Sequence, residues 1–166
     1  MERDLLVVAD TSPLNYLVRL GYSELLPDLY GRVLIPPAVL RELTHTSAPA
    51  EVRSWIAYPP SWLEVTAAAL IDPTLPPKLG LGEREAISLA LERRADAILI
   101  DDALGRSEAK ARALPVNGTL FVILESALRG RVNFEDGIRQ LRQIGFRFSL
   151  AVEEDMRWRF LKRKTQ

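Results

Sequence analysis

The sequence alternates between short apolar runs and longer segments whose apolar residues recur every three or four positions. Residues 5–9 form a continuous apolar run, which is typical of a strand buried on both faces of a parallel sheet. Residues 33–35 and 97–100 have the same character. Between such runs the apolar spacing is helical, as in residues 120–128. Strands that alternate with helices predict a parallel sheet covered by helices on both faces.

Proline, glycine and hydroxyl residues mark where the helices begin and end. Ser12, followed by a proline, is typical of a helix N-cap, and Gly21 ends that helix. The pair Pro36-Pro37 opens another helix. Thr119 caps the apolar helix at residues 120–128. The remaining pattern predicts helices near 25–29, 38–43, 51–56, 82–91, 103–113 and 134–144, and strands near 62–65 and 116.

The length of 166 residues suits one domain, since a domain averages roughly 150 residues. Residues 46–81 hold six of the eleven prolines and are expected to form an irregular elaboration inside that domain. We find no internal repeat. The domain is therefore expected to span residues 1–150, followed by a basic C-terminal extension at residues 151–166.

Composition excludes several kinds of chemistry. The chain has no cysteine, which rules out disulfides, thiolate metal sites, iron–sulfur clusters and a cysteine nucleophile. His45 is the single histidine, so a zinc site and a Ser-His-Asp triad are disfavoured. No apolar run approaches the roughly 18 residues of a membrane span, and the charged residues 1–4 lack the layout of a signal peptide. We therefore expect a cytoplasmic protein without membrane contact.

The formal net charge is zero, but the charges are unevenly distributed. Residues 1–100 carry 13 acidic and 9 basic side chains, a net charge of −4, and residues 101–166 carry the opposite balance. Arginine supplies 18 of the 22 basic residues, and its planar guanidinium suits phosphate. The basic residues are densest near the C-terminus, at Arg157, Arg159, Lys162, Arg163 and Lys164. This run is typical of a solvated helix end or of a nucleic-acid contact, and Arg106 is a further candidate contact.

Acidic residues lie next to the ends of the predicted strands. Asp10 directly follows the first strand, and Asp101 and Asp102 directly follow a later one. Glu83 lies in the first turn of the helix that leads to this later strand, and Glu42 lies on the helix that opens at Pro36-Pro37. Open parallel sheets bind ligands at the carboxyl ends of their strands. The sequence therefore predicts that Asp10, Glu42, Glu83 and Asp102 meet at one edge of the sheet.

Four carboxylates at one place repel one another, and a divalent cation between them relieves the repulsion. Oxygen donors suit Mg²⁺ or Mn²⁺. Such an ion lowers the pKa of a bound water and stabilises charge on a phosphate, which points to phosphodiester hydrolysis. Asp101 is a candidate additional ligand, and Ser12 and Thr119 are candidate supporting residues, Thr119 through a water molecule.

Structural roles remain open for each of these acidic residues. Asp10 and one of the Asp101-Asp102 pair are also typical helix caps. Glu83 suits a helix N-terminus through the helix dipole, and Glu42 suits an ordinary surface position.

Four segments in order carry a resemblance to a known family. They are residues 8–14 (VADTSPL), 33–43 (VLIPPAVLREL), 81–90 (LGEREAISLA) and 98–102 (ILIDD), the last followed by Gly105-Arg106 and by Asn117-Gly118-Thr119. In this order and at this spacing they resemble the PIN-domain family, and most of all a prokaryotic branch related to the VapC toxins of toxin–antitoxin modules. The resemblance covers about residues 5–148.

The resemblance implies a three-layer α/β/α sandwich with a central parallel sheet and a ribonuclease that depends on magnesium or manganese. It assigns the four acidic positions to Asp10, Glu42, Glu83 and Asp102, with Asp101 beside the last. Ser12 takes the small polar position beside Asp10. Glu83 departs from the pattern, because toxins of this type more often have aspartate there. The resemblance also implies an RNA substrate, a small antitoxin and a homodimer.

The leading interpretation is a metal-dependent ribonuclease that acts as the toxin of a toxin–antitoxin pair. The alternative is a non-catalytic PIN-like module that binds nucleic acid or protein. A phosphatase is disfavoured because a haloacid-dehalogenase-like enzyme needs a second aspartate two residues after Asp10, where this chain has Ser12. A receiver domain is disfavoured because the first strand is not followed by paired acidic residues.

Overall fold

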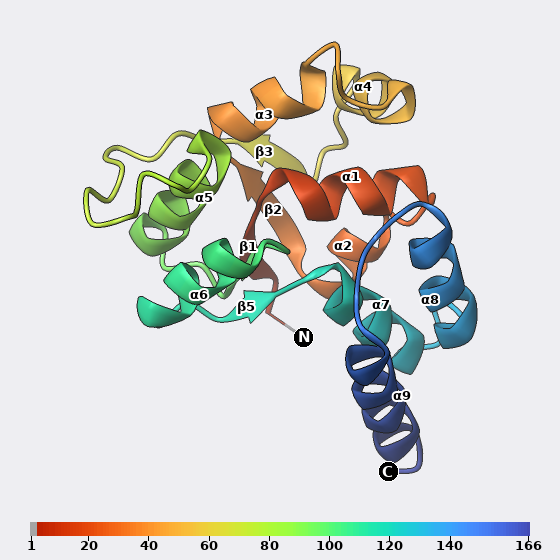
Figure 1. Ribbon diagram of the computed structural model, residues 1–166. Coiled ribbons are helices and arrows are strands. Elements are labelled where there is room, and N and C mark those ends of the chain that lie inside the picture. Colours follow the sequence, from red (N-terminus) through yellow and green to blue (C-terminus); the bar gives the residue numbers. More distant parts are fainter. Residues whose placement is uncertain (1–2) are drawn as a thin grey trace.

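The computed structural model describes residues 3–166 and contains a five-stranded, fully parallel sheet (Figure 1). Met1 and Glu2, with which the charged N-terminal sequence and the predicted domain begin, lie outside the described residues. The strands are β1 (Leu5–Ala9), β2 (Gly31–Ile35), β3 (Leu63–Val65), β4 (Ala97–Leu99) and β5 (Val116–Asn117). The predicted parallel sheet is therefore confirmed.

The strand order is β3-β2-β1-β4-β5, which puts the first strand at the centre. Val7 of β1 lies opposite Val33 of β2 on one side and opposite Ala97 of β4 on the other. The chain moves outward from β1 in one direction through β2 and β3, and in the other direction through β4 and β5. The crevice at the carboxyl ends of β1 and β4 is thus the switch point, where open sheets of this kind bind ligands.

Helices cover both faces of the sheet and complete the three layers (Figure 1). They are α1 (Thr11–Arg19), α2 (Leu25–Leu29), α3 (Pro37–Thr44), α4 (Ala50–Ala57), α5 (Leu81–Glu92), α6 (Ala103–Ala111), α7 (Thr119–Leu128), α8 (Phe134–Gln143) and α9 (Leu150–Lys164). In residues 3–166 no helix is long and apolar enough to cross a bilayer.

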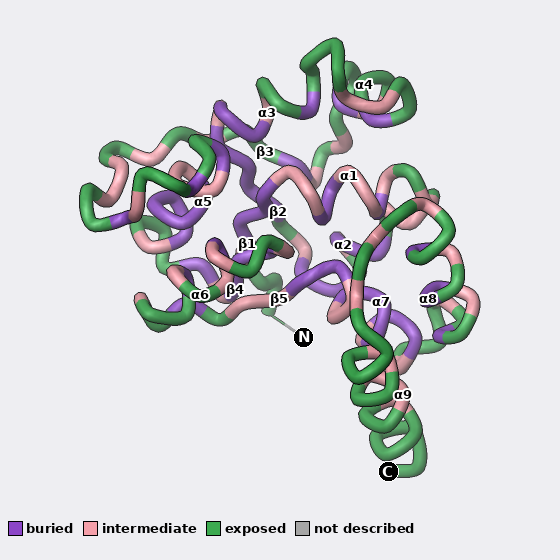
Figure 2. The backbone as a smooth tube through the Cα atoms, viewed as in Figure 1, coloured by how far each residue is buried: buried purple, intermediate pink, exposed green. Residues whose placement is uncertain are grey.

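Alternating strand residues supply two separate cores. Val7 and Ala9 face a core shared with α1, α2, α3, α4 and α7, whereas Val8 faces a core shared with α5 and α6. This division follows from the two-residue period of a strand, which sends successive side chains to opposite faces. Figure 2 shows the buried residues concentrated in and around the sheet, while α9 is largely exposed.

Two predicted helix caps are wrong. Ser12 lies inside α1, which begins at Thr11 with Asp10 at the N-cap position, and Thr119 is the first residue of α7, after Gly118. The hydroxyls of Ser12 and Thr119 donate instead to Asp101, at 3.0 and 2.7 Å. Each hydroxyl therefore donates to Asp101, which is distant in sequence, and does not accept a hydrogen bond from an amide in the first turn of its own helix.

The predicted C-terminal extension begins within helix α9, which packs on the body of the molecule. Phe160 of α9 stacks on Phe134 with ring centroids 4.9 Å apart, and Met156 joins the same apolar cluster. No residue of α9 is buried. Its apolar residues therefore follow no clear helical pattern from which this helix could have been predicted.

The proline-rich segment is anchored to the sheet layers at its centre. Asp72 accepts from the amide and hydroxyl of Thr74, at 2.8 and 2.6 Å, and from the guanidinium of Arg112, at 2.9 Å. Leu75 and Leu79 contribute to the core under α5. The half-buried carboxylate of Asp72 thus ties the segment to Arg112 at the end of α6.

We expect replacement of Asp72 by asparagine to lower the Tm at pH 7 and to have less effect as the pH falls. The hydrogen bond from the Thr74 hydroxyl, with the Thr74 amide and Arg112, lowers the pKa of Asp72 from 3.8 to about 2. A folded-state pKa below the unfolded value stabilises the protein above that unfolded value, and the gain disappears as the pH falls to the folded pKa. Calorimetry between pH 7 and 3 tests this, and a Tm difference that stays constant with pH contradicts it.

Candidate metal centre

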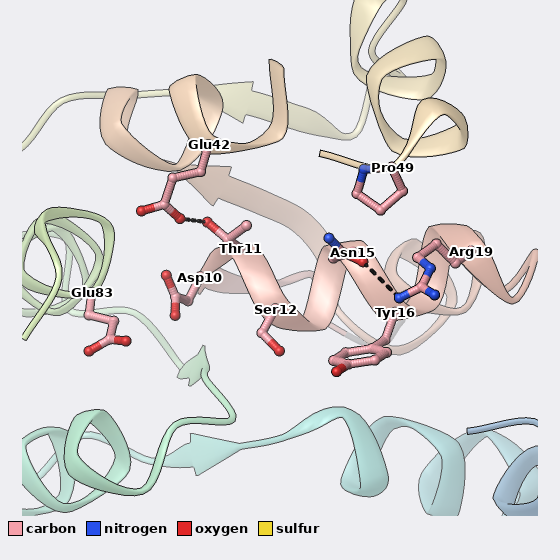
Figure 3. A pocket seen from close by; sticks show the side chains of 9 residues that line it. All are labelled: Asp10, Thr11, Ser12, Asn15, Tyr16, Arg19, Glu42, Pro49 and Glu83. Carbon is pink, nitrogen blue, oxygen red and sulfur yellow. Dashed lines mark hydrogen bonds between the residues drawn. The ribbon is translucent and has the colours of Figure 1, made fainter. Parts of the chain in front are cut away.

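A cavity of about 380 Å³ opens at the carboxyl ends of the central strands (Figure 3). Its walls come from the end of β1, the polar face of α1, and the facing helices α3 and α5. The lining residues are Asp10, Thr11, Ser12, Asn15, Tyr16, Arg19, Glu42, Pro49 and Glu83. Three of the four predicted acidic residues therefore share one cavity, although they are distant in sequence.

Asp10 is the buried centre of this group. Its backbone amide donates to the carbonyl of Leu99 at 2.9 Å, which places the residue between the ends of β1 and β4. Its exposed fraction is 6%. Burial raises the pKa of Asp10 from 3.8 to about 7, and the negative charges of Glu83, Glu42 and Asp101 add to the rise against the opposing Thr11 amide. The site therefore resists an uncompensated negative charge at Asp10.

Glu83 and Glu42 face this carboxylate from two helices (Figure 3). Burial, followed by the charges of Asp102 and Glu42, raises the pKa of Glu83 above its ordinary value. Glu42 accepts a hydrogen bond from the hydroxyl of Thr11. A Cβ atom at Gly82 would lie 2.7 Å from Oε1 of Glu42, so glycine at the start of α5 permits this close approach.

Asp101 and Asp102, adjacent in sequence, have different surroundings. Asp101 accepts from the hydroxyls of Ser12 and Thr119 and, at 2.8 Å, from the amide of Thr119. It thereby joins the end of β4 to the first turns of α1 and α7. Asp102 is exposed and accepts from the amide of Gly105 at 3.0 Å, as the N-cap of α6. It lies near enough to Glu83 to raise the pKa of that residue.

The donor set suits a hard cation, although the side chains do not form a closed ligand shell. As they stand, no three acidic or histidine residues among residues 3–166 form a group that could hold a metal ion. Glu42 already accepts a hydrogen bond from the hydroxyl of Thr11, and Asp102 accepts one from the amide of Gly105. However, all the donors are carboxylate oxygens, and two of them, Asp10 and Glu83, have pKa values raised by burial and by neighbouring carboxylates. A divalent cation would remove this electrostatic penalty, and oxygen donors are those that Mg²⁺ and Mn²⁺ prefer.

The family model described as DUF3368, a PIN domain, matches residues 6–159. The chain belongs to the PIN-domain family. This confirms the family resemblance, and PIN domains are generally nuclease folds that use divalent metal ions. A similar solved structure is a PilT N-terminus domain protein of the hyperthermophilic archaeon Sulfolobus solfataricus, with a TM-score of 0.54 and 16% identity over 74% of this chain and 93% of that chain. No curated protein matches this sequence.

The cavity of this PIN domain contains polar residues that the sequence patterns did not single out as candidates. Asn15 and Arg19 follow Thr11 at intervals of four residues, so all three lie on one face of α1. Arg19 is exposed and its Nη1 lies 3.5 Å from the amide oxygen of Asn15. The signal that could have found them is the spacing of polar residues every four positions from Thr11, the residue after Asp10.

Glu85 lies in the first turns of α5, close to Glu83 in sequence, but it is not among the residues that line the cavity. Its carboxylate accepts from the backbone amide of Ala38 at 2.7 Å, at the N-terminus of α3. It holds α3 against α5 and thereby fixes the distance between the helices that carry Glu42 and Glu83.

The predicted basic contacts of this PIN domain fall into three groups. Arg157 pairs with Glu135 and Glu153, and Arg163 pairs with Glu125, so these charges are neutralised where α9 meets the body. Lys162 lies 4.6 Å from the ring centroid of Trp158, and Lys164 lies 5.4 Å from that of Phe160. Arg106 and Arg159 line a second cavity beside Asp101.

Proposed function

We propose that this PIN domain is a metal-dependent ribonuclease that hydrolyses RNA phosphodiester bonds with Mg²⁺ or Mn²⁺. The observation that carries the proposal is the buried carboxylate of Asp10, with Glu42, Glu83 and Asp101 close enough to raise its pKa. These charges converge at the switch point of the sheet, where catalytic and ligand groups of this fold class gather. A buried carboxylate surrounded by other carboxylates costs stability, and groups with such strongly shifted pKa values gather at functional sites.

Asp10, Glu42, Glu83 and Asp102 would hold the cation. When bound, it would supply Lewis acidity that activates water and offsets charge on the phosphate. Asp101 is a positioning residue, because its three hydrogen bonds keep the ends of β4, α1 and α7 together around Asp10. Arg19, exposed at the cavity rim, would bind a phosphate of the substrate backbone.

Cleavage of end-labelled single-stranded RNA tests the proposal directly. We expect the full chain to cleave RNA with added Mn²⁺ or Mg²⁺, to be inactive in EDTA, and to leave DNA of the same sequence intact. Metal-independent cleavage, or cleavage of DNA alone, contradicts the proposal.

Replacement of Glu83 by glutamine is expected to weaken Mn²⁺ binding by about tenfold or more, because a neutral amide replaces a charged ligand. The size of the side chain is kept, so the fold should be unaffected. The measurement is the rise in Tm with increasing Mn²⁺, from which the affinity follows. Glu154→Gln is the matched control, since Glu154 is an exposed residue of α9. Equal Mn²⁺ affinity in the wild type and in Glu83→Gln would count against Glu83 as a ligand.

A non-catalytic module that binds nucleic acid is the second candidate. It is favoured by the absence, in the described chain, of three acidic or histidine side chains already arranged for a metal. RNA binding without cleavage, together with a Tm that Mn²⁺ does not change, would select this alternative.

We extend the proposal to the toxin of a toxin–antitoxin pair, held by a small antitoxin protein and acting as a homodimer in the cytoplasm. The support is the resemblance of the acidic segments to the VapC-related branch. Induced expression in a bacterial host is expected to arrest growth. An active-site variant expressed at the same level should not arrest growth. Normal growth of cells that express the active nuclease would exclude the toxin role.

A further inference from the structure

A second cavity, of about 600 Å³, adjoins the metal centre. Asp101 is part of its wall, and Ser12 is part of the wall of the first cavity. These two residues are joined by a hydrogen bond of 3.0 Å. The two cavities therefore lie next to each other, separated by this pair of side chains.

We call the second cavity the basic cleft, because four cationic and three aromatic residues are among those that line it. The cations are Arg106 and Lys110 of α6, Arg147 of the α8–α9 connection and Arg159 of α9. Within residues 3–166 neither Lys110 nor Arg147 has a carboxylate within ion-pair distance. Both side chains are exposed. Arg159 pairs only with the exposed Asp155 on its own helix, so the cleft keeps a positive charge.

The aromatic residues of the basic cleft are Phe121, Phe146 and Phe148. Phe146 packs edge-on against Tyr16 of the metal-centre cavity, with ring centroids 4.8 Å apart, and lies 5.9 Å from Phe148. A chain of aromatic contacts therefore links the wall of the first cavity to the wall of the cleft.

The wall formed by the α8–α9 connection is held in place. The guanidinium of Arg142 lies 3.9 Å from the ring centroid of Phe148 and donates to the Phe148 carbonyl at 3.3 Å. It also pairs with Glu153 at 2.6 Å. The cleft is thus a built feature that α8 and α9 fix jointly.

We propose that the basic cleft binds the nucleotides next to the scissile phosphate of single-stranded RNA. Lys110, Arg147 and Arg159 contact backbone phosphates, and Phe146 and Phe148 receive an unpaired base. Cations interleaved with aromatic rings are the usual surface for a single strand, because every base offers a face for stacking. A duplex keeps its bases stacked on one another and leaves the phenylalanines without a partner. The assignment of these nucleotides as substrate rests on the proposed ribonuclease function.

Binding measured without cleavage tests the cleft by itself. The probe is a fluorescein-labelled, twelve-nucleotide single-stranded RNA in EDTA, and the readout is anisotropy at several salt concentrations. We expect Lys110→Ala/Arg147→Ala to bind at least tenfold more weakly than wild type, with the salt slope reduced by roughly 0.7 for each cation removed. Phe146→Leu is expected to weaken binding by about fivefold or more with an unchanged salt slope.

The matched control is Lys78→Ala/Arg93→Ala, which removes two exposed cations away from the cleft. All variants are first compared by Tm, and only variants that match the wild type are used. An unchanged affinity in the cleft variant, an equal loss in the control, or tighter binding of duplex RNA overturns the proposal. If the cleft variant loses binding but the wild type never cleaves RNA, the RNA site stands and the ribonuclease proposal fails. If the wild type cleaves RNA while the cleft variants bind RNA as tightly as the wild type, the ribonuclease proposal stands and the RNA site in the cleft fails.

Discussion

Replacing Asp10 by asparagine is expected to abolish metal-dependent cleavage of RNA, with a loss in kcat/KM of at least about a hundredfold. Even residues that only support metal ligands commonly cost tenfold to a hundredfold when they are replaced. Asp10 is more central, because it is buried between the ends of β1 and β4 and faces Glu42 and Glu83. Asparagine keeps the shape of the side chain but removes its charge. The measurement is cleavage of labelled RNA with saturating Mn²⁺, and activity near the wild-type level contradicts the assignment.

The same substitution is expected to stabilise the metal-free protein, and more so as the pH rises. The pKa of Asp10 is about 7 in the folded protein, against an ordinary value of 3.8. When the folded pKa is the higher one, the native state loses stability as the pH rises from the unfolded value through the folded value. The asparagine side chain does not titrate. The stability of Asp10→Asn relative to wild type is therefore expected to increase between about pH 4 and 7 and to stay constant at higher pH.

Calorimetry in EDTA at pH 5 and pH 8 tests this second consequence. We expect the Tm of Asp10→Asn to exceed that of wild type by several degrees at pH 8 and by less at pH 5. Added Mn²⁺ should narrow the difference by binding the wild type preferentially. Glu154→Gln, which removes an exposed carboxylate, should change neither Tm. A lower Tm for Asp10→Asn at pH 8 would mean that the charge at Asp10 is structurally required.

Replacing Asp101 by alanine is expected to lower the free energy of unfolding by about 2 kcal/mol or more. The change removes the acceptor for three donors: the Ser12 hydroxyl, the Thr119 hydroxyl and the Thr119 amide. Thr119 is fully buried, so water cannot readily replace the lost acceptor. A buried donor left without a partner costs about 1–3 kcal/mol.

Asp102→Ala is the matched comparison, because it removes the neighbouring carboxylate. Asp102 caps α6 through one bond to the Gly105 amide, and such a cap is worth about 1 kcal/mol. Urea unfolding of both variants measures the difference. Equal losses, or a larger loss for Asp102→Ala, would contradict the view that Asp101 holds three elements together.

Local sequence was sufficient for most elements of the sheet and its helices. Apolar runs predicted the strands at residues 5–9 and 97–100, and helical spacing predicted the helix at 120–128. These patterns are local, because the period of a strand or helix decides which of its side chains are buried. The placement of acidic residues after strands predicted that they would share one edge, and Asp10, Glu42 and Glu83 do line one cavity. Four short segments in order were enough to identify the PIN family.

Only the tertiary structure separated Asp101 from Asp102, because the two differ in what the folded chain brings to them rather than in sequence. The hydroxyls of Ser12 and Thr119 reach Asp101 from other helices, whereas Asp102 finds its partner within its own helix. The same reason applies to α9, whose position depends on Phe134, Glu135 and Glu125, which lie 22 or more residues away. Sequence periodicity therefore determined the elements and the edge where the carboxylates meet. Contacts between distant segments decided which side chains face the cavity, which arginines are neutralised, and where a basic cleft remains open.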